Sequence, residues 1–204
     1  MSKNENFDIN HVLSVINEDT EFFPLLSTQD EEEMSKAEIP DILPILPLRN
    51  TVLFPGVVIP ITVGRDKSIK LVKEAYKKDR TIGVVSQKDM TIEEPTFDQL
   101  NKIGTVANII KVLQMPDGNT TVIIQGKQRF KLLELVDSEP YLKAKVARFD
   151  EDKPKVSSKE FKALISSIKE LALQIIQLSP NLPSEAAMAI KNIESHTFLV
   201  NFIS

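Results

Sequence analysis

Cysteine and tryptophan are both absent from this sequence of 204 residues, and only two histidines are present. Without cysteine there can be no disulfide bond, no thiolate catalysis and no cysteine-based metal site. The two histidines, His11 and His196, stand far apart in the chain. Their isolation argues against a histidine metal site and against a Ser-His-Asp triad.

Glycine is also scarce, and none of the six glycines forms part of a phosphate-binding motif. Neither GxxxxGK[ST] nor GxGxxG occurs, and each glycine stands alone at an expected turn or strand boundary. A Ser-Lys dyad needs only two common residues, but nothing in the sequence marks a serine as activated. We therefore predict no cofactor site, no metal site and no catalytic residue within these 204 residues.

Long apolar runs are missing as well. No segment approaches the roughly 20 apolar residues needed to cross a bilayer. The first ten residues, MSKNENFDIN, lack the basic start and apolar core of a signal peptide. We expect a soluble, cytoplasmic protein without a membrane partner.

The charge is unevenly distributed along the chain. The net charge is −4, yet residues 1–40 carry ten acidic residues and two lysines, so the remaining chain is net positive. Such an acidic segment is predicted to be a disordered, solvated arm. Two apolar clusters, at 7–16 and 22–26, leave open that parts of the arm fold on a partner.

Residues 42–64, ILPILPLRNTVLFPGVVIPITVG, are rich in Ile, Leu and Val and contain four prolines and one charge, Arg49. Proline cannot donate a ladder hydrogen bond, so Pro44, Pro47 and Pro60 suit edge strands, strand starts or bulges. The pattern predicts two short strands joined by a bend at residues 54–56, as at the entry of a small β-barrel.

Residues 41–150 are predicted to form one strand-dominated unit. Asp66 is a candidate N-cap of a helix, because Ile69, Val72, Ala75 and Tyr76 fall on one face at helical spacing. The remaining pattern predicts a strand at 81–86, a strand at 104–113, a turn at 115–119, its hairpin partner at 121–124, a reversal at 126–128, and strands at 129–136 and 142–146. About six strands and one helix without βαβ repetition indicate a mixed or antiparallel barrel in an α+β fold.

Residues 151–204 change to helical periodicity after a charged linker. Ser157 and Glu160 have the spacing of a capping box, and apolar residues recur every three or four positions over 161–176. Two shorter helices are predicted around 183–191 and 195–203. The last helix is still apolar where the sequence stops, so we expect a fragment that lacks downstream sequence.

Several surface residues are candidates for binding. Arg49, alone in its apolar run, could pair with a carboxylate or line an interaction groove. Bulky apolar residues at loop tips are unusual, so they either fold back on the barrel or form an adhesive patch for polypeptide clients. These loop-tip candidates are Phe54, Pro55, Met115 and Pro116.

Basic residues cluster at 77–80 and 127–131. Phosphate contacts need only Lys and Arg, so a nucleic-acid surface is conceivable. Tryptophan is absent and aromatic residues beside the clusters are few, Tyr76 among them, which gives poor platforms for base stacking. A solvated basic face is the simpler interpretation.

Four short motifs coincide in order: Leu-Pro-Leu-Arg at 46–49, Phe-Pro-Gly at 54–56, Val-Gly-Arg at 63–65 and Pro-Asp-Gly at 116–118. Together they resemble the N-terminal substrate-recognition domain of the Lon ATP-dependent protease family, over residues 42–149. The helical segment 157–203 is similar to the start of that family's helical region. The acidic arm lies outside the resemblance.

The resemblance implies a PUA-like pseudo-barrel followed by a helical subdomain, with boundaries at 1–40, 41–150 and 151–204. In this family the parent protein is a cytoplasmic homohexamer with a AAA+ ATPase that uses ATP and Mg²⁺, and with a Ser-Lys protease active in protein quality control and the stress response. Both catalytic parts are missing here, so this fragment should not be an enzyme. It should capture unfolded, misfolded or tagged clients. A PUA-like RNA-binding module and a purely structural assembly domain remain the alternatives.

Overall fold

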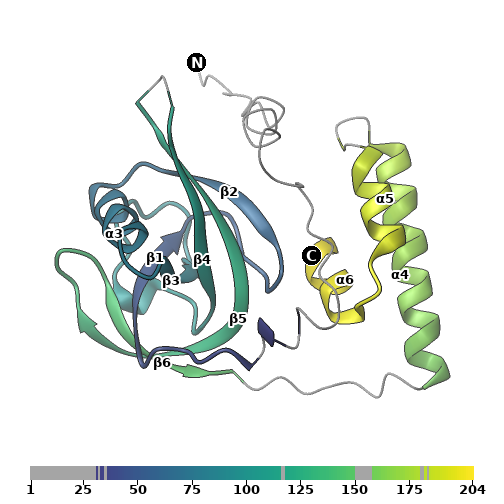
Figure 1. The fold of residues 1–204 in the computed structure, drawn as a ribbon, viewed down its shortest axis with the longest axis horizontal. Coiled ribbons are helices and arrows are strands. Elements are labelled where there is room, and N and C mark those ends of the chain that lie inside the picture. The colour runs from purple at the N-terminus through teal and green to yellow at the C-terminus, as the bar shows by residue number, and fades with distance from the viewer. Residues whose placement is uncertain are drawn as a thin grey trace.

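The structure, a computed structural model, describes residues 31, 33, 34, 36–115, 118–149, 158–179, 182 and 184–204. A strand-rich unit comes first and a group of helices follows (Figure 1). The elements in chain order are β1 (Ile42–Leu48), β2 (Val58–Val63), α3 (Asp66–Tyr76), β3 (Thr81–Ser86), η1 (Phe97–Gln99), β4 (Ile103–Gln114), β5 (Thr120–Asp137), β6 (Lys143–Arg148), α4 (Lys159–Leu178), α5 (Ser184–Asn192) and α6 (His196–Ile203).

The six strands form one mixed sheet in the order β2-β5-β4-β3-β1-β6, and a further pairing of β5 with β6 closes five of them into a ring. β1 and β3 run parallel, whereas the other paired strands are antiparallel. β2 stands outside the ring, because it pairs with β5 alone. This is the α+β pseudo-barrel that the sequence pattern predicts.

The prolines occupy positions where a missing N–H is tolerated. Pro60 lies in β2, which has one strand neighbour. β1 pairs with β6 around Pro44 and with β3 around Pro47, so each half of this strand has a partner on one side in the recorded register. The predicted edge position is therefore confirmed for Pro60, whereas Pro44 and Pro47 lie in β1, an inner strand between β3 and β6.

The predicted reversal at 126–128 is wrong, because β5 runs through it as one strand of 18 residues. The register with β4 shifts there, with Gly126 opposite Ala107 and Gln128 opposite Val106. A bulge of this kind bends a strand without ending it. The first half of β5 pairs with β2 and the second half with β6, so this bend lets one strand close the barrel.

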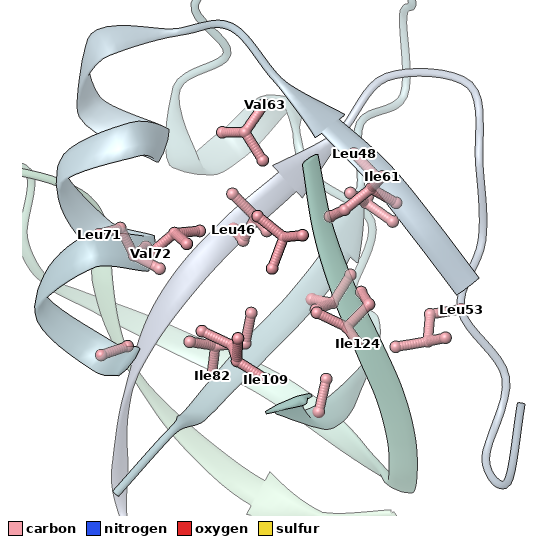
Figure 2. Packing of buried hydrophobic residues seen from close by; sticks show 14 of the residues in the cluster. Leu46, Leu48, Leu53, Ile61, Val63, Leu71, Val72, Ile82, Ile109 and Ile124 are labelled. Carbon is pink, nitrogen blue, oxygen red and sulfur yellow. The ribbon is translucent and has the colours of Figure 1, made fainter. Parts of the chain in front are cut away.

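The barrel interior holds two apolar clusters. One lies under α3 and joins it to β1, β2 and β4, and Figure 2 shows Leu71 and Val72 of the helix pointing toward Leu46. The other is built around Phe130, which is fully buried, with Leu43 and Ile45. Burying such side chains stabilises the fold by about 1.5–3 kcal/mol each, which explains why Leu43, Ile45 and Leu46 of the apolar run lie inside.

Two helices begin one residue away from the predicted caps. The N-cap of α3 is Arg65, and Asp66 is the first helical residue, so the predicted Asp66 cap is wrong. The N-cap of α4 is Ser158, whose hydroxyl accepts a hydrogen bond from the N–H of Phe161. The predicted reciprocal pair of Ser157 with Glu160 cannot be assessed in the same way, because Ser157 lies outside the described residues.

The helices pack on one another around Ile165, Ile190 and Leu199. They stand beside the barrel on the side away from α3 (Figure 1). Asn201 of α6 connects them to the barrel, because it accepts a hydrogen bond from Arg129 and donates one to the Pro55 carbonyl. No helix in the described ranges is long and apolar enough to cross a membrane.

Part of the predicted acidic arm is described. Ala37 accepts a hydrogen bond from Gln128 of β5 at 2.7 Å, and Glu31 accepts one from the Ser195 hydroxyl. This part of the arm therefore follows the barrel toward α6. Residues 1–30, which include both apolar clusters of the arm, fall outside the described residues.

Candidate functional site

A cavity of about 870 Å³ lies where the end of β1, the strand β2 and the start of α3 meet. Its wall combines main chain from residues 60–64 with two arginines, Arg49 and Arg65, and with the acidic pair Glu93 and Glu94. A concave site with a few converging polar groups is the usual form of a binding pocket.

One wall of this cavity is an unpaired strand edge. β2 pairs with β5 over its whole length, from Val58 opposite Gln125 to Val63 opposite Thr120, and no other described strand pairs with it. Backbone N–H and C=O groups alternate in direction along a strand, so about half of those in β2 point away from β5. An exposed edge of this kind can add an extended polypeptide as a further strand.

Arg65 is held firmly at the entrance to α3. Its guanidinium donates to Gln87 Oε1 at 2.8 Å and to the Pro47 carbonyl at 3.3 Å. Gln87 in turn donates to the carbonyls of Asp89 and Ile92, in the loop that leads to Glu93. One buried amide therefore fixes both a cation and the loop that carries the acidic wall.

Burial lowers the pKa of Arg65 below the usual value for arginine, and the nearby positive charge of Arg49 lowers it further. Glu94 and Glu93 act in the opposite direction and raise it. The guanidinium remains charged at neutral pH, because an arginine pKa lies far above 7. The lining of the cavity thus includes two cations that repel each other and the three carboxylates of Asp66, Glu93 and Glu94.

Arg49 is exposed and lines this cavity. In the described part of the chain no carboxylate forms an ion pair with it. Of the two interpretations drawn from the sequence, the position beside a groove describes this geometry better than a buried ion pair. Its role in client binding stays a prediction.

The other predicted site residues lie elsewhere. Phe54 and Pro55 are half-buried between the barrel and α6, with Arg129 5.7 Å from the Phe54 ring and the Pro55 carbonyl bound to Asn201. Met115 is half-buried at the tip of the β4–β5 hairpin, where its N–H bonds to Asn119. Pro116 lies outside the described residues.

These predicted residues do not form one surface. Gly56, next to Pro55, bonds to Gly126 at one end of β2, whereas Gln114, next to Met115, pairs with Thr120 at the other end. Six strand residues separate the two ends, which corresponds to about 20 Å. Phe54 and Met115 therefore do not lie in one surface patch, although each remains a candidate contact residue for a client.

The basic cluster on β5 is largely engaged within the protein. Burial lowers the pKa of Lys127, whose ammonium donates to Gln125, and Arg129 bonds to Asn201. Arg80 of the other cluster lies 4.5 Å from the Tyr76 ring. Side chains fixed in this way are poorly placed to follow a phosphate backbone, so a nucleic-acid surface gains no support.

A row of apolar side chains along α4 is a second exposed feature. Leu164, Leu171, Ile175 and Leu178 are 58–84% exposed, while Ile165 and Ala172 on the opposite face are buried. Clusters of large exposed apolar side chains usually mark contact surfaces. Within the described ranges no group of three or more His, Asp or Glu side chains is arranged to hold a metal ion.

Sequence reasoning did not single out Arg65, Ser68, Glu93 or Glu94 as site residues. Arg65 had one available signal, because it immediately precedes a helix at a position where Ser, Thr, Asp or Asn usually provides the cap. Glu93 and Glu94 carry no such signal, since only the folded loop brings them opposite the arginines.

Residues 42–204 match the family model described as the ATP-dependent protease La (LON) substrate-binding domain. The chain belongs to the Lon substrate-binding domain family. It is 57% identical over 192 residues to a Lon protease of Flavobacterium johnsoniae and 54% identical over 187 residues to one of Cytophaga hutchinsonii. These matches cover 94% and 92% of this chain but only 24% and 23% of those relatives, so the chain spans about a quarter of their length.

Solved structures support the same fold. The N-terminal domain of the Lon protease of the Mycobacterium avium complex matches with a TM-score of 0.63 at 21% identity, over 78% of this chain and 80% of that one. A Lon N-terminal domain protein from Xanthomonas campestris matches with a TM-score of 0.51 at 18% identity, over 74% and 90%. Identities this low carry information on the fold alone.

Proposed function

We propose that this Lon-family domain binds unfolded segments of client polypeptides, for delivery to the ATP-dependent protease of a longer parent protein. The family is described as substrate-binding, and its full-length relatives are named Lon proteases. The observation that carries the proposal is the unpaired edge of β2 beside a cavity of about 870 Å³. Backbone pairing there would accept many sequences, as a quality-control domain requires.

The wall of the cavity favours polypeptide over nucleic acid. Two arginines face three acidic side chains among the lining residues, Asp66, Glu93 and Glu94. A phosphodiester chain would be repelled by those carboxylates, whereas a polypeptide presents N–H donors to them. Neither ATP binding nor peptide cleavage is proposed for residues 1–204; we assign those activities to the remainder of the parent protein, together with its homohexameric assembly.

The test is a fluorescence-anisotropy titration of the 204-residue chain with a labelled, permanently unfolded polypeptide. A folded protein of similar charge and a short RNA serve as comparisons, each at two salt concentrations. We expect binding of the unfolded chain alone, with little dependence on salt. Binding of RNA that weakens steeply with salt would instead favour the nucleic-acid alternative.

A variant on β2 connects that binding to the strand edge. Pro60 cannot donate to β5, and Thr62 has the same parity, so the Thr62 N–H is expected to point away from β5. Replacing Thr62 by Pro removes that donor, while Thr62→Val retains it and serves as the control. We expect Thr62→Pro alone to weaken polypeptide binding, with circular dichroism verifying that both variants are folded. Equal affinity for the two folded variants would place the client elsewhere.

The row on α4 supports a second role, in assembly. Leu164, Leu171 and Leu178 alternate with Ile168 and Ile175 at spacings of four and three residues. Ile at a and Leu at d is the pattern of a parallel two-stranded coiled coil, which points to a second copy of this chain as partner. Sedimentation analysis tests this role: Leu171→Glu should abolish a dimer that the exposed control Ser167→Glu leaves intact, and a wild-type monomer would refute it.

A further inference from the structure

We propose that the α3 end of this cavity binds the free C-terminal carboxylate of a client polypeptide. The inference rests on the proposed function and specifies which part of a client polypeptide the cavity binds. A client strand that pairs in parallel with β2 runs toward Gly64 and Arg65. Its chain end would therefore arrive where α3 begins.

The first observation is the start of α3, a helix of 11 residues. Its N-cap Arg65 provides no side-chain cap, and the N–H groups of Asp66, Lys67 and Ser68 have no acceptor in the described part of the chain. By contrast, serine hydroxyls cap α4 and α6. Uncapped N–H groups at a helix start, together with the helix dipole, favour a negatively charged ligand.

The second observation is independent of the helix terminus. Ser68 is only 6% exposed and lines the cavity, yet its hydroxyl has no hydrogen-bond partner among the described residues. Every fully enclosed side-chain N or O atom of the described residues does have a partner. The Ser68 hydroxyl must therefore keep some access to the cavity, where a ligand oxygen can accept a hydrogen bond from it.

Two arginines complete the charge of the site. Arg65 is oriented by Gln87, and Arg49 lines the same cavity without a carboxylate partner in the described ranges. A guanidinium offers parallel N–H donors that match the two oxygens of a carboxylate. A carboxylate between the two would also relieve the repulsion between two like charges that line one cavity.

The acidic wall distinguishes a chain terminus from other anions. Glu93, Glu94 and Asp66, the first residue of α3, line the cavity together with the arginines, so a ligand with negative charge throughout would meet repulsion there. A polypeptide end carries one carboxylate, and the N–H groups of the residues before it can donate to Glu93 and Glu94. Space for such a chain exists beside Gly64, since an added Cβ there would meet no atom within 4 Å.

The experiment compares two unfolded probes of one sequence, labelled at the N-terminus, that end in a carboxylate or in a carboxamide. Anisotropy titrations give the affinity of each probe for the wild-type chain, for Arg49→Gln and for Ser68→Ala. Lys111→Gln removes an equal charge on the exposed part of β4 and serves as the control. Urea unfolding verifies that the variants are folded.

We expect the carboxylate probe to bind the wild type and Lys111→Gln roughly tenfold more tightly than the carboxamide probe, as lost charge-assisted hydrogen bonds imply. Arg49→Gln and Ser68→Ala should reduce that ratio and leave the affinity for the carboxamide probe almost unchanged. Equal binding of both probes by the wild type would overturn the inference while polypeptide capture stands. A preference that persists in both variants would overturn the assignment to this cavity, and binding of neither probe would overturn polypeptide capture as well.

Discussion

Gln87 accepts a hydrogen bond from Arg65 at 2.8 Å, and this contact ties the start of α3 to the segment that follows β3. The same side chain, which is 6% exposed, donates to the carbonyls of Asp89 and Ile92. A single amide thus satisfies three polar groups around the cavity, which makes its removal a direct test of how the site is built.

Replacing Gln87 by Leu should lower the free energy of unfolding by about 2 kcal/mol. The change removes one of the two acceptors of the Arg65 guanidinium and the amide donor to two loop carbonyls, and buried unsatisfied groups carry a desolvation penalty of this size. Urea unfolding measures the effect, with Gln114→Leu at the exposed end of β4 as control. An unchanged midpoint for Gln87→Leu would mean that the loop and Arg65 are held by other contacts.

Replacing Gly126 by Ala should destabilise the protein by roughly 1–3 kcal/mol, the range for overpacked sites. A Cβ there would lie 2.2 Å from the Phe54 carbonyl oxygen, and main chain cannot move aside as a flexible side chain does. Gly64→Ala is the matched control, because its Cβ meets nothing within 4 Å. Thermal or urea unfolding of both variants should therefore separate them clearly, and similar stabilities would contradict the close approach of residue 54.

Tyr141 makes stability sensitive to alkaline pH. Burial raises the pKa of its hydroxyl above 10.0, and the hydrogen bond to Glu74 Oε2 at 2.9 Å raises it further. A raised pKa in the folded state means that its contribution is complete below pH 10 and is lost as the pH rises through the folded-state value. Between pH 8 and 11.5 the free energy of unfolding should fall more steeply with pH for the wild type than for Tyr141→Phe.

At neutral pH the free energy of unfolding of the same Tyr141→Phe variant should be lower than that of the wild type by about 1 kcal/mol, the usual net contribution of one hydrogen bond. Tyr76→Phe on α3 is the control, because the Tyr76 hydroxyl forms no hydrogen bond with another described residue. Parallel stability curves of the wild type and Tyr141→Phe above pH 10 would rule out Tyr141 as the group responsible.

Replacing Asn201 by Leu should loosen the attachment of the helices to the barrel. Asn201 is 5% exposed, accepts from Arg129 at 2.9 Å and donates to the Pro55 carbonyl at 3.1 Å. Hydrogen exchange should become faster in α6 while β3 and β4 keep their protection. Val200→Ala, at an exposed neighbour, should change stability by less than about 0.5 kcal/mol. Unaltered exchange in Asn201→Leu would show that apolar packing alone holds α6.

Much of the fold was predictable because local sequence fixes local structure. β3 spans the predicted residues 81–86, and the predicted period change after 150 matches the start of α4 at Lys159. The error at 126–128 arose because Gly next to polar residues suggests a turn. Here glycine serves another purpose, since Gly126 admits the Phe54 carbonyl and lies at a bulge. Long-range contacts of that kind leave no periodic signal.

The site was less predictable than the fold. Arg49 stood out as a lone charge in an apolar run, and it lies in the cavity. Phe54 and Pro55 stood out for their apolar character, but the helices partly cover them through Asn201, 146 residues from Pro55 in the chain. A residue's apolar character is visible in the sequence, whereas the element that covers it depends on tertiary packing.

By itself, the sequence determined the α+β class, most strand and helix positions, the edge position of Pro60 and the resemblance to the Lon family. Periodicity and the fixed geometry of proline act over a few residues, so they can be read locally. Only the tertiary structure decided that β5 closes the barrel while β2 keeps an open edge, and that Arg49, Arg65, Ser68, Glu93 and Glu94 meet in one cavity. Such encounters join residues far apart in the chain, and they are fixed by how the buried apolar surfaces pack together.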